Sequence, residues 1–140
     1  MEKKDYKIGI YIRTAQSNDE AVKLQETLNV SYCKYRGYSN IYKIYIDNGK
    51  SGMTEERAAY KRLLKDVRNG KVNVIVVSDF ERLTRQPIYF YHKMISCIES
   101  GKLLVLSVMD SNISDLKISN AKKIINFADM ALKYEIGGVE

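Results

Sequence analysis

Short apolar runs alternate with amphipathic stretches from one end of the chain to the other. The apolar runs are rich in isoleucine, valine and tyrosine, residues that favour buried strands. They predict strands over residues 7–13, 41–46, 72–78 and 103–107. The stretches between them carry apolar residues at spacings of three and four, which indicates helices. The first helix is expected to begin at a cap within 17–19 and to end at Gly37. The other helices are expected at about 56–69, 87–101 and 119–135.

The alternation of strands and helices predicts a three-layer α/β domain, in which flanking helices cover a largely parallel central sheet. The run VNVIVVS at 72–78 is the strongest strand pattern and is expected at the centre of the sheet. We expect a single domain over 1–140, because no repeat, low-complexity tract or linker interrupts the pattern. The face of the first helix that is expected to pack on the sheet consists of Ala21, Leu24, Leu28, Tyr32 and Tyr35.

Charged side chains follow the predicted strands at their carboxyl ends, where ligands bind in open parallel sheets. Arg13 ends the first strand and Asp47 the second. The third strand leads into the segment SDFERLTR at 78–85. Because the carboxyl ends of parallel strands meet at one edge, we expect these side chains to share one crevice.

Arginines dominate this expected crevice. Arg82 and Arg85 are three residues apart, which places both on one face of a helical turn. Arg57 opens the second helix and can point into the same space. Converging guanidinium groups repel one another, so such a cluster favours a phosphate or carboxylate ligand. The alternative is that each arginine forms its own surface ion pair, with partners among Glu55, Glu56 and Asp79.

Composition narrows the classes of partner and compartment. Lys and Arg number 23 against 17 Asp and Glu, and the resulting charge of +6 favours a polyanionic partner. Two cysteines cannot build a disulfide framework, so we expect a reducing, cytoplasmic compartment. No run approaches the roughly 18 apolar residues of a membrane span, and neither nucleotide-binding loops nor metal-ligand spacings occur. We therefore expect no membrane, nucleotide, metal or other cofactor.

Several of the polar residues fall into three short motifs in a fixed order. The motifs are Tyr11-Ile12-Arg13-Thr14-Ala15, Glu56-Arg57-Ala58-Ala59 and Glu81-Arg82-Leu83-Thr84-Arg85, accompanied by Gln25, Asp47 and Ser51-Gly52. Together they resemble the catalytic domain of the serine site-specific recombinases, the resolvase and invertase group. The family patterns are Y-x-R-x-S, E-R-P-G and D-R-L-x-R. The resemblance is strongest to the large serine recombinases and extends over about 7–134.

The resemblance implies a resolvase-like catalytic domain that recombines and integrates DNA of mobile elements. A serine hydroxyl attacks a DNA phosphate and forms a 5′-phosphoseryl intermediate, without a metal or nucleotide cofactor. By the same resemblance, the scissile phosphate of the DNA is held by Arg13, Arg57, Arg82 and Arg85. Glu81 orients arginines or assists proton transfer. Supporting roles near the site fall to Gln25, Ser51 and Asp47.

One departure from the family changes the expected chemistry. Ala15 stands where the family has its nucleophilic serine, and a methyl group has no lone pair with which to attack phosphorus. The chain is therefore expected to be catalytically inactive as written. Three explanations stay open: a deliberate Ser→Ala substitution, a naturally degenerate recombinase, or the use of Ser17 as nucleophile through a shifted loop. Smaller departures are Ala58-Ala59 in place of Pro-Gly and Glu81 in place of Asp.

The last predicted helix, 119–136, is apolar on more than one face, which is too apolar for a helix on a single core. In the family this helix forms the dimer interface. We therefore expect a homodimer, and a tetramer in the synaptic complex, through Ile124, Phe127, Ala128 and Ala131. The resemblance covers a catalytic domain only, so no DNA-binding domain is expected within these 140 residues.

Two other functions stay open. The chain is either a natural pseudo-recombinase that regulates or pairs with an active recombinase, or an α/β domain that binds a small phosphate ligand. A row of cations on the second helix, made of Arg57, Lys61, Lys65 and Arg68, has two interpretations as well. It contacts DNA phosphates, or it is a solvated helix face.

Overall fold

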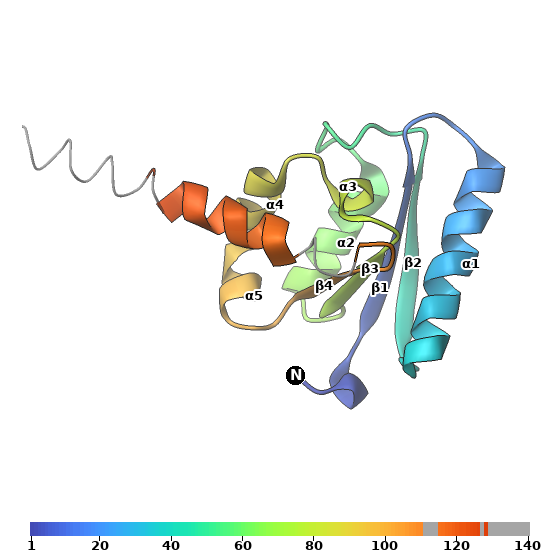
Figure 1. The fold of residues 1–140 in the computed structure, drawn as a ribbon, viewed down its shortest axis with the longest axis horizontal. Coiled ribbons are helices and arrows are strands. Elements are labelled where there is room, and N and C mark those ends of the chain that lie inside the picture. The colour runs from blue at the N-terminus through green and yellow to red at the C-terminus, as the bar shows by residue number, and fades with distance from the viewer. Residues whose placement is uncertain (111–114, 127, 129–140) are drawn as a thin grey trace, which may run out of the picture.

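A computed structural model describes residues 1–110, 115–126 and 128. In this part of the chain, four strands form one parallel sheet in the order β2-β1-β3-β4 (Figure 1). The strands are β1 (Ile8–Thr14), β2 (Ile41–Asn48), β3 (Val74–Val77) and β4 (Leu104–Ser107). The prediction that the 72–78 run lies at the sheet centre is confirmed, and β1 is the other inner strand.

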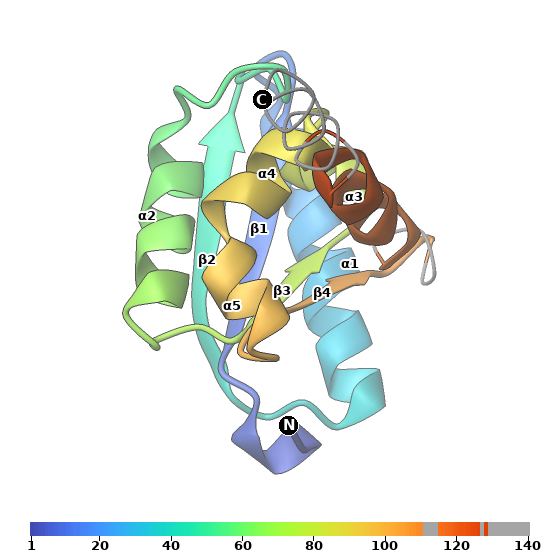
Figure 2. The same cartoon turned by 90° about the vertical axis from the view of Figure 1, so that its left-hand side faces the viewer.

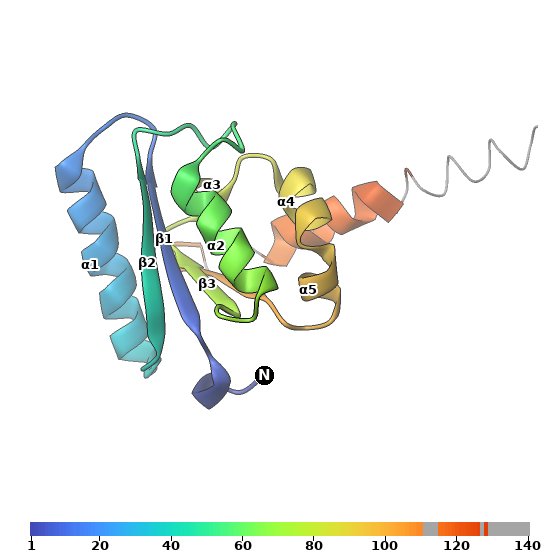
Figure 3. The ribbon, with the colours of Figure 1, turned by 180° about the vertical axis from the view of Figure 1, so that it is seen from behind.

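Helices cover both faces of this sheet. They are α1 (Asp19–Arg36), α2 (Ala58–Arg68), α3 (Phe80–Leu83), α4 (Pro87–Lys93) and α5 (Ile95–Glu99), preceded by a 3₁₀ turn at Lys3–Asp5. α1 lies on one face, while α2, α4 and α5 lie on the other (Figures 1 and 3). The predicted three-layer α/β architecture is therefore confirmed.

The sheet has a separate apolar core on each face. Side chains alternate along β1, so Ile10 and Ile12 pack on the α1 side while Tyr11 packs with α2. β3 alternates in the same way, with Val76 toward α1 and Ile75 toward the opposite layer. Because both inner strands are buried on both faces, the strand ends are held on a rigid support.

The face of α1 that packs on the sheet matches the predicted one only in part, since Tyr32 packs on the core as expected but Leu24 and Tyr35 do not. Its buried residues are Gln25, Asn29 and Cys33, whereas Leu24 is 71% exposed and Tyr35 is 88% exposed. The physical reason lies at the strand ends, where Gln25 and Asn29 form hydrogen bonds that an apolar side chain cannot make. The predicted helix ends are confirmed: Asn18 caps the N-terminus of α1, and Gly37 ends it in the left-handed region (φ 75°).

Other boundaries differ from the prediction in detail. The helix expected at 87–101 is interrupted at Met94, whose backbone (φ −111°, ψ 15°) is not helical and which separates α4 from α5. α2 begins at Ala58, because Arg57 is extended (φ −119°, ψ 115°). The four-residue helix α3 is too short to produce a periodic pattern, so the sequence did not separate it from its surroundings.

The C-terminal helical segment begins earlier than predicted. Residues 115–126 are helical, whereas the expected start was 119. Ala121 is buried, Ile118 packs on the main core, and Lys122 forms an ion pair of 3.1 Å with Glu99 of α5. Among the described residues, no helix is both long and apolar enough to cross a lipid bilayer.

The expected interface residues are described only in part. Ile124 is half-exposed and lines, together with Ile88 of α4, a groove of about 270 Å³. Ala128 is exposed. Phe127 and Ala131 lie outside the described residues.

Candidate functional site

The candidate site lies at the carboxyl ends of β1 and β3, where the strand order reverses. The chain passes from β1 to its neighbour β2, and from β2 across β1 to β3, which makes this edge the usual ligand position in such sheets. β1 pairs with β2 from Ile8 to Thr14, but with β3 only as far as Ile10. Beyond Ile10, the backbone N–H and carbonyl groups of β1 on the side of β3 need hydrogen-bond partners that do not come from a strand.

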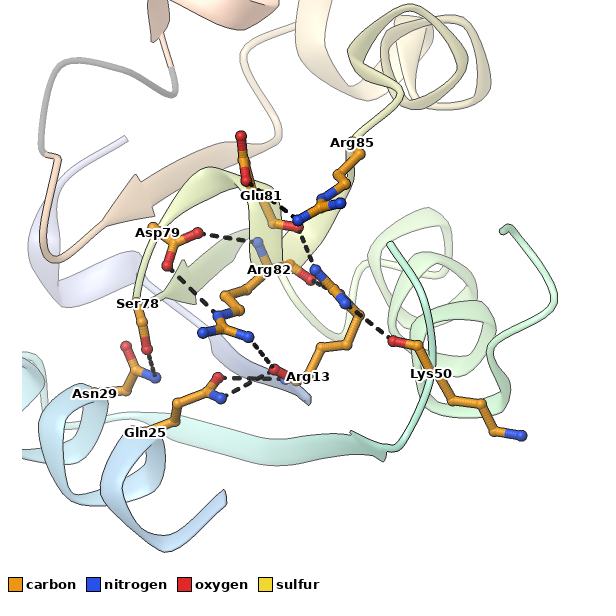
Figure 4. A network of polar contacts seen from close by, with 9 residues as sticks. All are labelled: Arg13, Gln25, Asn29, Lys50, Ser78, Asp79, Glu81, Arg82 and Arg85. Carbon is orange, nitrogen blue, oxygen red and sulfur yellow. Dashed lines mark hydrogen bonds and ion pairs between the residues drawn. The ribbon is translucent and has the colours of Figure 1, made fainter. Parts of the chain in front are cut away.

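Two side chains take the place of the missing strand at Arg13 (Figure 4). The side chain of Gln25 accepts a hydrogen bond from the backbone N–H of Arg13 at 3.4 Å, and its Nε2 donates to the carbonyl of the same residue at 2.9 Å. Nη1 of Arg82 donates to that carbonyl at 3.2 Å. The amide of Gln25 thus imitates a strand partner and fastens α1 to the end of β1.

The side chain of Arg13 joins three segments of the chain. Its Nε donates to the carbonyl of Arg82 at 3.0 Å, its Nη1 to that of Lys50 at 3.0 Å and its Nη2 to that of Glu81 at 2.8 Å (Figure 4). A guanidinium has five N–H donors, so two of those of Arg13 have no partner among the described residues. Arg13 is 3% exposed and therefore forms the floor of the site.

The electrostatic surroundings of Arg13 are positive. Burial lowers the pKa of its guanidinium from the ordinary value, and the neighbouring charge of Arg57 lowers that pKa further, with smaller effects from Arg82 and Arg85. The group remains a cation at neutral pH, because an arginine does not deprotonate in proteins. The three other arginines singled out from the sequence therefore each lie near enough to Arg13 to disfavour its positive charge.

Gly52 allows the close approach of the chain to Arg13. A Cβ added at Gly52 would lie 2.8 Å from Nη2 and 3.0 Å from Cζ of Arg13, and 3.2 Å from the carbonyl oxygen of Glu81. These distances are shorter than van der Waals contact, so a side chain there would displace the guanidinium. Ser51, the residue before it, is exposed, and its hydroxyl accepts a hydrogen bond from the N–H of Met53 at 3.1 Å.

Arg82 and Arg85 face solvent at the same edge. Nε of Arg82 lies 3.5 Å from Oδ2 of Asp79, and Nη2 of Arg85 lies 3.8 Å from Oε2 of Glu81. Asp79 also caps α3, since it accepts a hydrogen bond from the backbone N–H of Arg82 at 3.2 Å. The expectation that both arginines share one helical turn is wrong, because α3 ends at Leu83 and the next residue is extended.

Arg57 is held apart from the solvent-facing arginines. It is fully buried, its Nε donates to the carbonyl of Thr54 at 2.8 Å, and its Nη1 donates to the hydroxyl of Tyr11 at 2.8 Å. Its Cζ lies 3.8 Å from the ring centroid of Tyr60. The structure therefore places this charge behind the site, and in this conformation a ligand arriving from solvent does not reach it.

Asp47 connects the end of β2 to the start of α2. It accepts hydrogen bonds from the backbone N–H groups of Ala59 at 3.0 Å and Tyr60 at 2.9 Å, and from the hydroxyl of Tyr11 at 2.7 Å. The carboxylate satisfies two amides in the first turn of α2, which favours an anion at that end. Burial raises the pKa of Tyr11 far above its ordinary value, and the bond to Asp47 raises it further.

Ala15 is exposed directly after β1, two residues beyond Arg13. The loop that follows is fastened by Asn48, whose Oδ1 accepts from the hydroxyl of Thr14 at 2.6 Å and from the backbone N–H of Asn18 at 2.9 Å. Ser17 is exposed, and its backbone packs against Gly49. The sequence analysis named Asp79 as an ion-pair partner of an arginine, which the contact with Arg82 bears out, but missed its capping of α3 and the role of Asn48. An Asn after a strand and an Asp before a short helix are common caps.

The described residues offer little to a metal ion. In 1–110, 115–126 and 128, no three His, Cys, Asp or Glu side chains come together as ligands. The carboxylates of the site, Asp47, Asp79 and Glu81, are each engaged with amides or cations of their own surroundings.

The chain matches the family of the resolvase N-terminal domain over residues 8–132, which is most of its length. It therefore belongs to this family, that of the serine recombinase catalytic domains. The family is one of site-specific recombinases, enzymes that act on DNA as assemblies of subunits. A comparison with curated protein sequences gave no significant match.

Solved structures of similar fold come from the same group of proteins. The catalytic domain of TP901-1 integrase is 22% identical with a TM-score of 0.72, covering 89% of this chain and 98% of its own. A resolvase family site-specific recombinase from Streptococcus pneumoniae is 21% identical with a TM-score of 0.66, covering 95% and 94%. The catalytic domain of ISC1926 TnpA, an IS607-like serine recombinase, is 19% identical with a TM-score of 0.62, covering 86% and 99%. At these identities the likeness establishes the fold.

Proposed function

We propose that this chain holds a phosphate of DNA at the candidate site, where Arg13 and Arg82 lie at the carboxyl ends of the strands. A serine recombinase catalytic domain does the same, but this chain would not form the phosphoseryl link. The observation that carries the proposal is Ala15 at the nucleophile position, exposed beside an otherwise equipped arginine site. The function is thus DNA binding by a recombinase catalytic domain that does not cleave.

The hydrogen-bond donors left at the site support the phosphate part of this proposal. Nη2 of Arg82 has no partner among the described residues, and Arg85 has one long ion pair, so both can donate to phosphate oxygens. Arginine suits this role because its planar group binds phosphate through two parallel hydrogen bonds. In this scheme Arg13 and Arg57 contribute charge from beneath, Glu81 orients Arg85, and structural support comes from Gln25, Ser51 and Asp47.

The chemistry of Ala15 supports the non-cleaving part. Cleavage by the family route forms a bond between a serine oxygen and phosphorus while the 3′ oxygen of the DNA leaves. Ala15 has no atom that can form this bond. Using Ser17 instead would require the loop to move, which would break the hydrogen bond between Asn18 and Asn48 and the cap that Asn18 provides to α1.

Binding to duplex DNA tests the phosphate part directly. We expect a 30-base-pair duplex to bind with an affinity that falls steeply with salt, because each phosphate contact releases counterions. Arg82→Ala should weaken binding about tenfold, since a charged hydrogen bond contributes roughly 1.5–3 kcal/mol. Arg36→Ala, an equal loss of charge at the exposed end of α1, should change the affinity less than about twofold. Equal effects of both variants would contradict a localised site.

A regulatory function is the second candidate, and the exposed Ile124 beside Ile88 is the observation that favours it. In this version the chain pairs with itself, or with an active recombinase, through its C-terminal helix. Light scattering on the purified chain should then report a dimer, and Ile124→Lys should convert it to a monomer while Leu24→Lys, on the exposed face of α1, should not. A monomer at every concentration would remove the homodimer from the proposal.

A further inference from the structure

A cleft lies at the opposite end of the sheet from the candidate site. It has a volume of about 520 Å³ and lies between the C-terminal ends of α2 and α5, beside the start of β1. Figures 2 and 3 both show these helix ends at the end of the sheet where the N-terminus lies. We call it the basal cleft and define it by Lys7, Arg68, Asn69, Ser96, Ser100 and Lys102.

The charge of the basal cleft has one sign. Its lining includes Lys7, Arg68 and Lys102, and none of its lining residues is acidic. Within the described part of the chain, the side chains of Arg68 and Lys102 form no ion pair or hydrogen bond. Lys7 donates to the carbonyl of Gly70 at 2.8 Å, which leaves two further N–H donors on its ammonium group. The cleft therefore holds three cations, none of which forms an ion pair with a carboxylate in the described part of the chain.

The helix ends at the cleft do not create a cation site. Carbonyls at a helix C-terminus attract cations when they are free. Here the carbonyl of Lys65 accepts from the N–H of Asn69 at 3.0 Å, and that of Cys97 accepts from the N–H of Lys102 at 2.8 Å. The hydroxyl of Ser100 donates to the carbonyl of Cys97 at 3.3 Å, and the backbone N–H groups of 69–71 and 100–102 donate to carbonyls as well. Among the described residues of the cleft, the charged donors that remain are the ammonium and guanidinium groups, which bind an anion.

The exposure of these cations points to a polyanion instead of a small ion. Lys7, Arg68 and Lys102 are all exposed at the rim, and Lys65 and Lys71 are exposed beside them on or just after α2. A small anion binds where donors converge and water is excluded, whereas a phosphodiester backbone binds along an open row of cations. Of the row of cations predicted on the second helix, Arg57 is buried and precedes α2, and Lys61 forms an ion pair with Glu56. Arg68, the last of the row, lines the cleft.

We propose that the basal cleft is a second phosphate-binding site, which takes a backbone phosphate of a nucleic acid. The basal cleft does not depend on the candidate site, since the seven residues of β1 separate the two places by about 20 Å. A duplex bound at one site is therefore not automatically in contact with the other. The chain would have two separate contacts with nucleic acid.

Amide chemical shifts measured during a titration test this directly on the full chain. With a 12-base-pair duplex, we expect the N–H signals of Asn69, Gly70 and Gly101 to shift, separately from those of Gly52 and Glu81 at the candidate site. In the double variant R68A/K102A the basal shifts should disappear, while those of Gly52 and Glu81 persist. The slope of log affinity against log salt should fall by about 1 for each removed cation. Arg36→Ala, which removes one exposed cation elsewhere, is the control and should leave the basal shifts unchanged.

Inorganic phosphate at the same ionic strength separates the two sources of phosphate. Basal shifts with the duplex and none with millimolar phosphate support the proposal. Basal shifts that phosphate alone saturates, with none from the duplex, would overturn it in favour of a small-ion site. If neither ligand causes basal shifts, the proposal is wrong, and these cations only stabilise the helix ends. Arg82→Ala should abolish the shifts at Gly52 and leave the basal shifts. The basal cleft and the proposed function at the candidate site are then tested independently of each other.

Discussion

Arg13 and Arg57 are buried cations without a carboxylate within ion-pair distance among the described residues, so neutral groups have to solvate them. Arg13 uses three backbone carbonyls, while Arg57 uses one carbonyl, a tyrosine hydroxyl and the face of Tyr60. Burying a charge is costly unless hydrogen bonds replace the lost water. These neutral contacts leave both charges without a carboxylate partner, so both add positive potential at this edge of the sheet, although in this conformation a ligand from solvent does not reach Arg57.

The hydroxyl of Tyr11 is the link between a buried cation and a buried carboxylate. Tyr11→Phe removes the acceptor of Arg57 and a donor to Asp47 at once, so both lose a hydrogen bond in a buried place. We expect the free energy of unfolding to fall by about 1–3 kcal/mol in urea denaturation. Tyr35→Phe, on an exposed side chain of α1, serves as the control and should change it by less than about 0.5 kcal/mol. Equal values for the two variants would contradict the structural role of the hydroxyl.

Gly52 is the residue where a single methyl group should disturb the site. Gly52→Ala places a Cβ 2.8 Å from Nη2 of Arg13, so the guanidinium has to shift and lose carbonyl partners. We expect a loss of about 1–3 kcal/mol in stability, as for other overpacked positions, together with weaker binding of duplex DNA. Met53→Ala, in the same loop and exposed, should leave both properties close to those of the unchanged chain. Unaltered DNA binding in Gly52→Ala would show that the position of Arg13 does not matter.

At the scale of elements, α1 shows what a sequence pattern can and cannot predict. Its two ends were predicted correctly, because a capping Asn18 and a left-handed Gly37 act through local geometry. Its inward face was predicted only in part: Tyr32 packs on the core, but hydrophobic periodicity also assigns Leu24 there, and Leu24 is exposed. The end of β1 instead requires Gln25 there, as the strand has no β3 partner beyond Ile10.

The candidate site shows the same difference between what local patterns predict and what tertiary contacts determine. The motifs identified Arg13, Arg82 and Arg85 as neighbours, because strand ends gather at one edge of a parallel sheet. The burial of Arg57 and its contact with Tyr60 depend on how the segment after β2 returns to α2, which spacing alone does not determine. Short helices such as α3 are likewise set by a cap, here Asp79, and by tertiary contacts.

The cap of α1 can be tested as an element. Asn18→Ala removes the side-chain oxygen that accepts from the N–H of Ala21 at 3.0 Å, and we expect about 1 kcal/mol of lost stability. Asn18→Asp keeps an acceptor and adds a negative charge at the helix N-terminus, so it should be at least as stable as the unchanged chain. Thermal unfolding followed by circular dichroism distinguishes the two. Identical melting temperatures for both variants would mean that the cap contributes nothing.

At the scale of the whole molecule, several buried weak acids make stability depend on alkaline pH. Burial raises the pKa of the Cys33 thiol to about 11, and burial followed by the bond to Glu99 raises that of Tyr91 to about 12. The pKa values of Tyr45 and Tyr60 are also raised, chiefly by burial. In each case the folded-state pKa exceeds the unfolded one. The stability that each buried neutral group contributes is therefore complete below the unfolded pKa and is lost as pH rises through the folded pKa.

The free energy of unfolding should therefore stay level to about pH 9, the unfolded value of a thiol, and then fall continuously toward pH 12. Urea denaturation at several pH values measures this, and Cys33→Ala should remove the part of the decline between about pH 9 and 11. Tyrosinate absorbance recorded in parallel should rise together with unfolding. A stability that is constant up to pH 11 would show that these groups ionise freely in the folded chain.

The central claim is that the site is that of a serine recombinase whose nucleophile position is filled by Ala15. The most direct measurement is an SDS-resistant protein–DNA adduct formed on a supercoiled plasmid by the unchanged chain, by Ala15→Ser, and by A15S/R82A. We predict an adduct for Ala15→Ser alone, linked through position 15, because removing a nucleophile costs on the order of 10⁶ in rate in well-studied enzymes. An adduct formed by the unchanged chain and abolished by Ser17→Ala would contradict the claim, as would an Ala15→Ser chain that binds DNA equally well and never forms one.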